Sequence, residues 1–129
     1  MIGYVTVGTR DLQRAAPFYD ALAKELDTPR MMESDSFIAW ARADGQAAGI
    51  GLTLPYDGQP ATVGNGVMVA LAARDETQVD RLYQIALDQG GTCEGPPGPR
   101  GEGFYAAYFR DLDGNKLNAF IMTPGFQPE

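Results

Sequence analysis

The chain contains two related segments, and this internal repeat limits its possible folds more than any other feature. Asp11 and Tyr19 in the first segment recur as Asp75 and Tyr83 in the second, 64 positions later in both cases. Each aspartate follows an arginine and precedes a stretch with helical spacing. A unit that occurs twice indicates duplication of one supersecondary motif, because a solenoid requires three or more copies.

The first copy predicts a strand, a helix and then three short strands. Residues 3–8 alternate apolar and polar side chains, which is typical of a strand with one buried face. Asp11 is a suitable N-cap for the helix, and Pro17 predicts a kink or a delayed start. The apolar stripe of this helix consists of Leu12, Ala15, Ala16, Tyr19, Leu22, Ala23 and Leu26. The later strands are expected near residues 30–32, 37–42 and 49–54.

The second copy repeats this order after a connector rich in turn-forming residues. Asp75 caps the expected helix, with Gln78 completing a capping box. Strands are expected near residues 67–72, 92–94, 104–110 and 116–122. We therefore predict an α+β fold in which two tandem βαβββ modules form a curved mixed sheet with a concave cavity and helices outside. The chain is expected to be a single domain, 1–129, with modules 1–56 and 66–129 joined by the connector 57–65.

Charge and cysteine content limit the possible partners. The formal net charge is −7, which disfavours binding to nucleic acids and to anionic membranes. Cys93 is the only cysteine and is expected to be a buried or half-buried small side chain. No apolar run approaches the roughly 20 residues of a membrane span, and no signal pattern opens the chain. We expect a cytoplasmic protein.

Three stretches, residues 4–7, 66–69 and 108–118, carry a resemblance to a known family. The most specific of them contains the aspartate-rich turn Asp111-Leu112-Asp113-Gly114-Asn115. With the paired helix starts, they resemble the vicinal-oxygen-chelate family, which includes the glyoxalases, the bleomycin-resistance proteins and the extradiol dioxygenases. The resemblance implies the same paired-module architecture. It also implies a homodimer, because family members often pair modules across two chains.

The family places one metal ligand at each of four cavity-facing strand positions. These correspond here to Tyr4, Gly49 (or Gly51), Met68 and Asn118, and the chain contains no histidine. Zinc, iron, nickel and manganese favour imidazole or carboxylate donors, which none of these residues supplies. We therefore predict that the chain holds no metal and no other cofactor.

Strand alternation predicts which side chains face the cavity. The expected concave side consists of Tyr4, Thr6, Ile38, Trp40, Arg42, Met68, Ala106, Tyr108, Arg110, Asn118 and Phe120. Eight of these are the predicted ligand-binding residues: Tyr4, Thr6, Trp40, Met68, Tyr108, Arg110, Asn118 and Phe120.

Several of these residues have two interpretations. The positions of Thr6 and Tyr108 match substrate-contacting Thr and Tyr residues in fosfomycin-resistance members of the family. Trp40 and Tyr108 occupy equivalent places in the two copies, where they either flank a planar ligand or pack in the core. Arg42 and Arg110 each precede an Asp-Gly turn, which favours pairing with a nearby aspartate over holding a carboxylate or phosphonate ligand.

The glycine- and proline-rich loop 94–103 is expected over the mouth of the second module, where it either gates entry or crosses the surface. Glu102 in this loop is either a general base or an exposed carboxylate. We predict that the chain binds a small organic ligand in a metal-free aromatic cavity. The alternatives are a metal-dependent glyoxalase- or dioxygenase-type enzyme with non-standard ligands, a metal-free enzyme that uses Tyr, Arg or Glu, and a purely structural domain.

Overall fold

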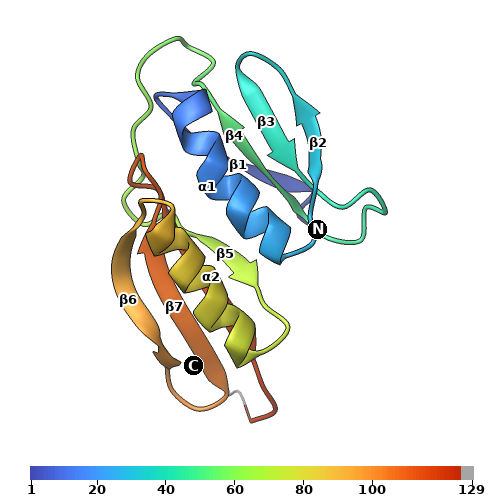
Figure 1. Cartoon of the computed structure of the whole chain (residues 1–129), viewed down its shortest axis with the longest axis vertical. Coiled ribbons are helices and arrows are strands. Elements are labelled where there is room, and N and C mark those ends of the chain that lie inside the picture. Colours follow the sequence, from blue (N-terminus) through green and yellow to red (C-terminus); the bar gives the residue numbers. More distant parts are fainter. Residues whose placement is uncertain (126–129) are drawn as a thin grey trace.

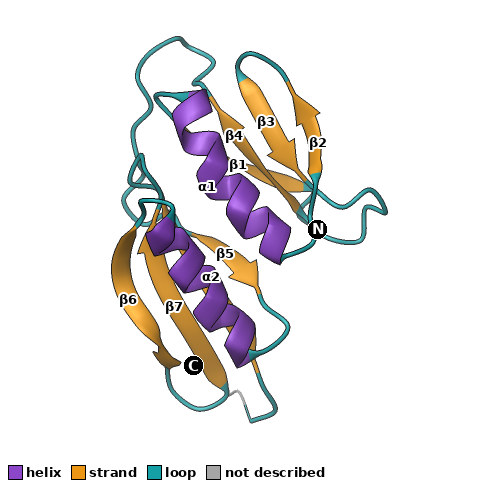
Figure 2. Ribbon diagram, in the orientation of Figure 1, coloured by secondary structure: helices purple, strands orange, loops and turns teal. Residues whose placement is uncertain are grey.

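The computed structural model describes residues 1–125 and contains two helices and two four-stranded mixed sheets (Figures 1 and 2). The first module comprises β1 (Tyr4–Gly8), α1 (Leu12–Glu25), β2 (Arg30–Glu33), β3 (Phe37–Trp40) and β4 (Gly49–Thr53). The second comprises β5 (Val69–Ala72), α2 (Glu76–Asp88), β6 (Thr92–Pro99), β7 (Phe104–Arg110) and β8 (Lys116–Met122). The predicted α+β class with two tandem βαβββ modules is confirmed. The last four residues of the predicted second module lie outside the described residues.

Both modules have the same strand order, so the repeat in the sequence is a repeat in the topology. The sheets run β1-β4-β3-β2 and β5-β8-β7-β6. In each, the first strand pairs with the fourth in parallel, and the other pairings are antiparallel. Both helices cover the same side of the molecule, and β1 and β5 are edge strands at the junction between the modules (Figure 1). The opposite face of each sheet is therefore left without a helix.

Both helices begin at the predicted caps. The Asp11 carboxylate accepts from the backbone N–H of Arg14 at 3.1 Å, and the Asp75 carboxylate accepts from that of Gln78 at 2.7 Å. These bonds satisfy donors that have no partner inside the helix. Pro17 lies within α1 without ending it, since the helix continues to Glu25. Within residues 1–125, neither helix has the length and apolar character needed to cross a membrane.

The core lies between the helices and the sheets and also joins the two modules. On α1, the Phe18 ring lies 6.4 Å from that of Phe109 on β7, so one helix packs on strands of both modules. The buried residues include Val7, Phe18, Tyr19, Leu22, Ile38, Trp40, Leu52, Val79, Leu82, Ala107, Phe109, Leu117 and Ala119. Those on strands are the residues that face the helices, as strand alternation requires, and the others lie on the sheet-facing sides of α1 and α2.

The aspartate-rich turn after β7 docks the second module onto the first. Asp111 is 4% exposed and accepts a short hydrogen bond from the Tyr19 hydroxyl of α1. Asn115 donates to the Gly8 carbonyl at 2.8 Å, and the Thr9 hydroxyl donates to Asp113 at 2.6 Å. Burial, followed by the nearby Asp111 charge, raises the pKa of Tyr19 well above its ordinary value. The turn predicted as a hairpin is therefore also a contact between modules.

The structure corrects two expectations for residues 92–103. Most of the predicted loop 94–103 belongs to β6, which continues to Pro99 with two irregularities in its register. Its prolines are tolerated because β6 is an edge strand, where a missing N–H costs no ladder bond. Cys93 on this strand is exposed rather than buried.

Candidate functional site

We refer to the helix-free faces of the two sheets, where the cavity was predicted, as the concave face. In the first module this face is largely apolar. Tyr4 and Thr6 project from β1 and are exposed, whereas Val5 and Val7 turn toward α1. A groove of about 530 Å³ lies along this part of the face. Residues lining it include Ile2, Tyr4, Met31, Met32, Phe37, Ala39 and Gly49. Because most of the side chains that line the groove are apolar, the groove suits an apolar molecule better than a polar one.

Trp40 does not lie on the concave face, so its predicted placement is wrong. Its side chain is 1% exposed, and the indole N–H donates to the Asp20 carboxylate on α1 at 2.9 Å. The Trp40 and Tyr19 rings lie 5.6 Å apart on the helix side of the sheet. Ile38, which was also predicted on the concave side, is buried with them at 2% exposure.

A one-residue error in aligning the repeats explains this misplacement. Ala39 lies opposite Gly51 on β4, and Tyr108 lies opposite Asn118 on β8. Gly51 also pairs with Thr6 of β1, and Asn118 pairs with Ala70 of β5. Thr6 and Ala70 are 64 residues apart and therefore equivalent in the repeat, so Ala39 is the counterpart of Tyr108. Trp40 corresponds instead to the next, buried residue of β7. A shift of one residue moves a side chain to the other face of a sheet.

The two arginines of the repeat also differ in their partners. Arg42 pairs with Asp44 at 2.5 Å, as the nearby-aspartate interpretation predicted. Arg110 pairs with Glu94 on β6 instead of an aspartate, and it donates to the Gly114 carbonyl at 2.8 Å. The hydrogen bond from Arg110 is the main cause of a lowered pKa for Glu94.

The predicted concave residues of the second module do share one face. Tyr108, Asn118 and Phe120 lie opposite the helix-facing residues of β7 and β8, with Phe120 stacked on Phe104 at 5.8 Å between centroids. Asn118 is 1% exposed, and its side-chain oxygen has no hydrogen-bond partner among the described residues. A buried amide oxygen without a donor is costly and points to a missing partner.

Two cations that the sequence analysis did not single out lie beside Tyr108. The Arg100 guanidinium is 5.5 Å and the Lys116 ammonium 5.6 Å from the centre of the Tyr108 ring. Lys116 was detectable from the sequence, because it lies two residues before Asn118 and so shares its face. Glu102 lies exposed in the turn after β6, and the structure gives it no contact with the concave face.

The four positions that correspond to metal ligands do not offer a metal-binding set. Tyr4 is 67% and Met68 is 42% exposed, and they supply a phenol and a thioether. At Gly51, a Cβ atom would lie 2.7 Å from the Phe37 ring, so that ring occupies the space of a side chain there. Within residues 1–125, no three His, Cys, Asp or Glu side chains gather at a possible metal site. Asn118 adds a single amide oxygen and the glycine position adds no side-chain donor, so this set does not fit zinc or iron.

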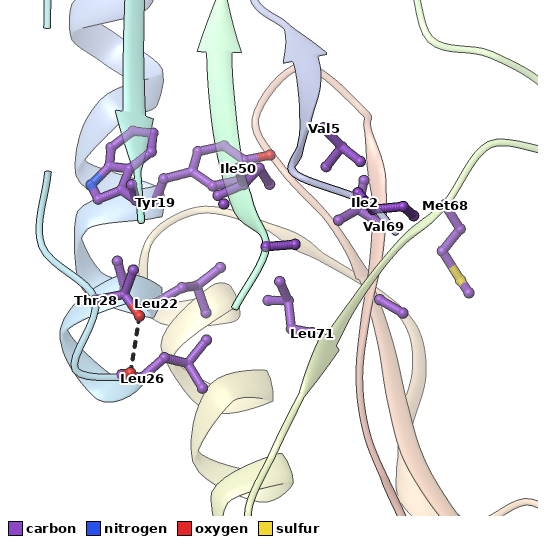
Figure 3. A pocket seen from close by; sticks show the side chains of 15 residues that line it. Ile2, Val5, Tyr19, Leu22, Leu26, Thr28, Ile50, Met68, Val69 and Leu71 are labelled. Carbon is purple, nitrogen blue, oxygen red and sulfur yellow. Dashed lines mark hydrogen bonds between the residues drawn. The ribbon is translucent and has the colours of Figure 1, made fainter. Parts of the chain in front are cut away.

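A separate pocket lies on the helix side, where the modules meet (Figure 3). It has a volume of about 420 Å³ and is lined mainly by aliphatic side chains, including Val5, Leu22, Leu26, Ile50, Val69 and Leu71. The hydroxyl of Thr28 donates to the Leu26 carbonyl at 3.0 Å and so has no free donor for a ligand. Sequence patterns gave no signal for this pocket, since it depends on how the modules are packed together.

Comparisons with known proteins agree with the architecture. The family model of the Glyoxalase/Bleomycin resistance protein/Dioxygenase superfamily matches residues 1–119. A glyoxalase/bleomycin resistance protein from Albidiferax ferrireducens T118 is 40% identical, with a TM-score of 0.85 over 93% of this chain and 97% of that one. The fosfomycin resistance protein FosX from Mesorhizobium loti shares the fold at 18% identity, with a TM-score of 0.68 over 96% of this chain and 93% of that one. No match was found among curated proteins. The chain therefore belongs to the glyoxalase/bleomycin resistance protein/dioxygenase superfamily.

Proposed function

We propose that this protein binds a small, largely apolar organic molecule on its concave face and does so without a metal ion. The observation that carries the proposal is the groove of about 530 Å³ beside Tyr4 and Phe37, which is lined mainly by apolar side chains and includes Tyr4 and Gly49, two of the positions where the family places metal donors. Ligand sites are commonly apolar with a few polar anchors.

We also propose that two copies of the chain associate through this face, as a cytoplasmic homodimer. Large apolar side chains on and beside the concave face are exposed, including Ile2, Tyr4, Met31, Met32 and Met68. Exposed apolar patches of this kind mark interaction or ligand sites. A second copy would cover the patch and bring a first-module face against a second-module face. Light scattering at micromolar concentration tests this, and a monomer mass would contradict it.

A thermal-shift screen with uncharged phenols tests the ligand proposal. Phenols are small and largely apolar, and they combine an aromatic ring with a single polar group, which suits the apolar lining of the groove. A ligand at 100 times its Kd stabilises the folded state by about 2.7 kcal/mol, which raises Tm by several degrees. Tyr4→Ala should reduce the shift, whereas Tyr56→Ala, at a residue that is 108% exposed just before the connector, should retain it.

Two results would overturn the proposal. The first is the absence of any shift across the compounds, which would favour a purely structural domain. The second is a stoichiometric transition metal that survives dialysis in elemental analysis, which would favour a metal-dependent enzyme with non-standard ligands. Turnover of a bound phenol without metal would extend the proposal to a metal-free enzyme.

A further inference from the structure

We propose that a second pocket, next to the concave face, binds the anionic group of a small organic acid, either a carboxylate or a phosphonate. This anion pocket lies between residues 63–68, where the connector ends and the second module begins, and the side chains of Arg110 and Lys116. Its volume is about 550 Å³. The inference rests on the proposed function, because Met68 belongs both to this pocket and to the concave face.

The charge of the anion pocket is opposite to that of the protein. The chain has 17 acidic and 10 basic residues and a formal net charge of −7. The residues that line the pocket nevertheless include two cations and no carboxylate. Arg100 adds a third cation nearby, since it and Lys116 both lie against the Tyr108 ring. An anion that approaches this part of an acidic protein therefore meets a local positive field.

Lys116 provides one half of the site. Among the described residues, its ammonium group has no carboxylate within 4.0 Å; it lies against the Tyr108 ring and is attracted at longer range by Glu94. Nearby Glu94 is already paired with Arg110, so one carboxylate faces two cations and one positive charge remains uncompensated. An ammonium group in this state can form a charge-assisted hydrogen bond with a ligand oxygen.

Arg110 provides the fixed half. Its Nε atom is held by Glu94 and its Nη1 atom donates to the Gly114 carbonyl, which together fix the plane of the guanidinium. Among residues 1–125, no hydrogen-bond partner of the Arg110 Nη2 atom is found. A guanidinium that is already oriented loses little entropy when it donates to a carboxylate or phosphonate oxygen.

The neutral wall of the pocket leaves room for a ligand. It includes Gly64 and Gly66, and a Cβ atom placed on Gly66 would meet no atom within 4 Å. Gly66 has a φ of +95°, a conformation that favours glycine and keeps this wall free of a side chain. From Lys116, the face continues through Tyr108 to Asn118, so the organic part of the ligand would lie there.

Lysine NMR provides a direct test, because the chain has only two lysines, Lys24 and Lys116. Protein labelled with ¹³C at lysine Cε is titrated with benzoate and with phenylphosphonate. We expect a saturable shift of the Lys116 resonance and an unchanged Lys24 resonance, since Lys24 lies in the last turn of α1. In calorimetry, Lys116→Met should weaken benzoate binding at least tenfold, and Lys24→Met should leave it unchanged.

Three outcomes would overturn the inference. The first is that the resonances of both lysines shift in parallel and without saturation. The second is that benzoate binds Lys116→Met with the same affinity as the wild type. The third is that benzoate binds no more tightly than uncharged benzyl alcohol. Benzyl alcohol keeps failure here separate from failure of the proposed function. If one of these three outcomes occurs while benzyl alcohol binds the wild type and Lys116→Met equally well, the concave ligand site stands and only the anion pocket is refuted.

Discussion

Replacing Tyr19 with Phe should destabilise the protein by an amount that depends on pH in a specific way. Tyr19 is 3% exposed, and its hydroxyl donates to the carboxylate of Asp111, which is 4% exposed. A hydrogen bond to a charged group contributes about 1.5–3 kcal/mol, and its loss leaves a buried acceptor short of one donor. We therefore expect Tyr19→Phe to lower the free energy of unfolding by about 2 kcal/mol at pH 7.

The pH dependence follows from the raised pKa of Tyr19. In the unfolded chain its hydroxyl titrates near the ordinary value of 10.0, whereas in the folded protein burial and the Asp111 charge keep it protonated to higher pH. The stabilisation is therefore complete below pH 10 and is lost as pH rises toward the folded pKa. At about 1.4 kcal/mol per pH unit, the ~2 kcal/mol advantage of the wild type disappears roughly 1.5 units above pH 10.

Urea unfolding, followed by circular dichroism at several pH values between 7 and 11.5, measures this difference. Tyr4→Phe is the matched control, because Tyr4 is 67% exposed and has no recorded hydrogen bond, so removing its hydroxyl should change stability by no more than about 0.5 kcal/mol. Equal stability of Tyr19→Phe and the wild type at pH 7 would refute the reasoning. A difference that stays constant up to pH 11.5 would refute the assignment to Tyr19 ionisation.

Three further predictions concern stability and can be measured by urea unfolding. Gly51→Ala should cost about 1–3 kcal/mol, because the new Cβ atom would lie 2.7 Å from the Phe37 ring, and Phe37→Ala should remove most of this cost. Trp40→Phe should cost about 2 kcal/mol through loss of the indole hydrogen bond to Asp20, and an unchanged midpoint would contradict the buried placement of that ring. Hydrogen bonds from Arg81 and then Gln78 lower the pKa of Glu25, so their stabilisation is present above pH 4.5 and is lost as pH falls. Glu25→Gln should therefore cost about 1 kcal/mol at pH 7, and this cost should shrink as pH falls through the lowered pKa of Glu25; a constant difference would argue against this pairing.

Some of the candidate site was predictable because it depends on strand alternation in a strongly patterned segment. Residues 104–122 form a hairpin around a single tight turn, so Tyr108, Asn118 and Phe120 could be assigned to one face. The first module has a weaker pattern, because residues 37–41 are all apolar and show no alternation. An alignment of the repeat shifted by one residue therefore placed the Trp40 side chain on the wrong face. No local pattern indicated that the Phe37 ring covers Gly51, because this contact depends on how β3 pairs with β4.

Local patterns determined that this chain forms two βαβββ modules, because helix periodicity, the caps Asp11 and Asp75 and the hairpin turn act over a few residues. They also determined that the family's metal positions lack suitable donors, which follows from residue type alone. Only the tertiary structure decided how the modules meet, through Asp111 and Tyr19, and which cations gather around Tyr108. These arrangements join residues that are far apart in the chain, and no local spacing encodes the distance between them.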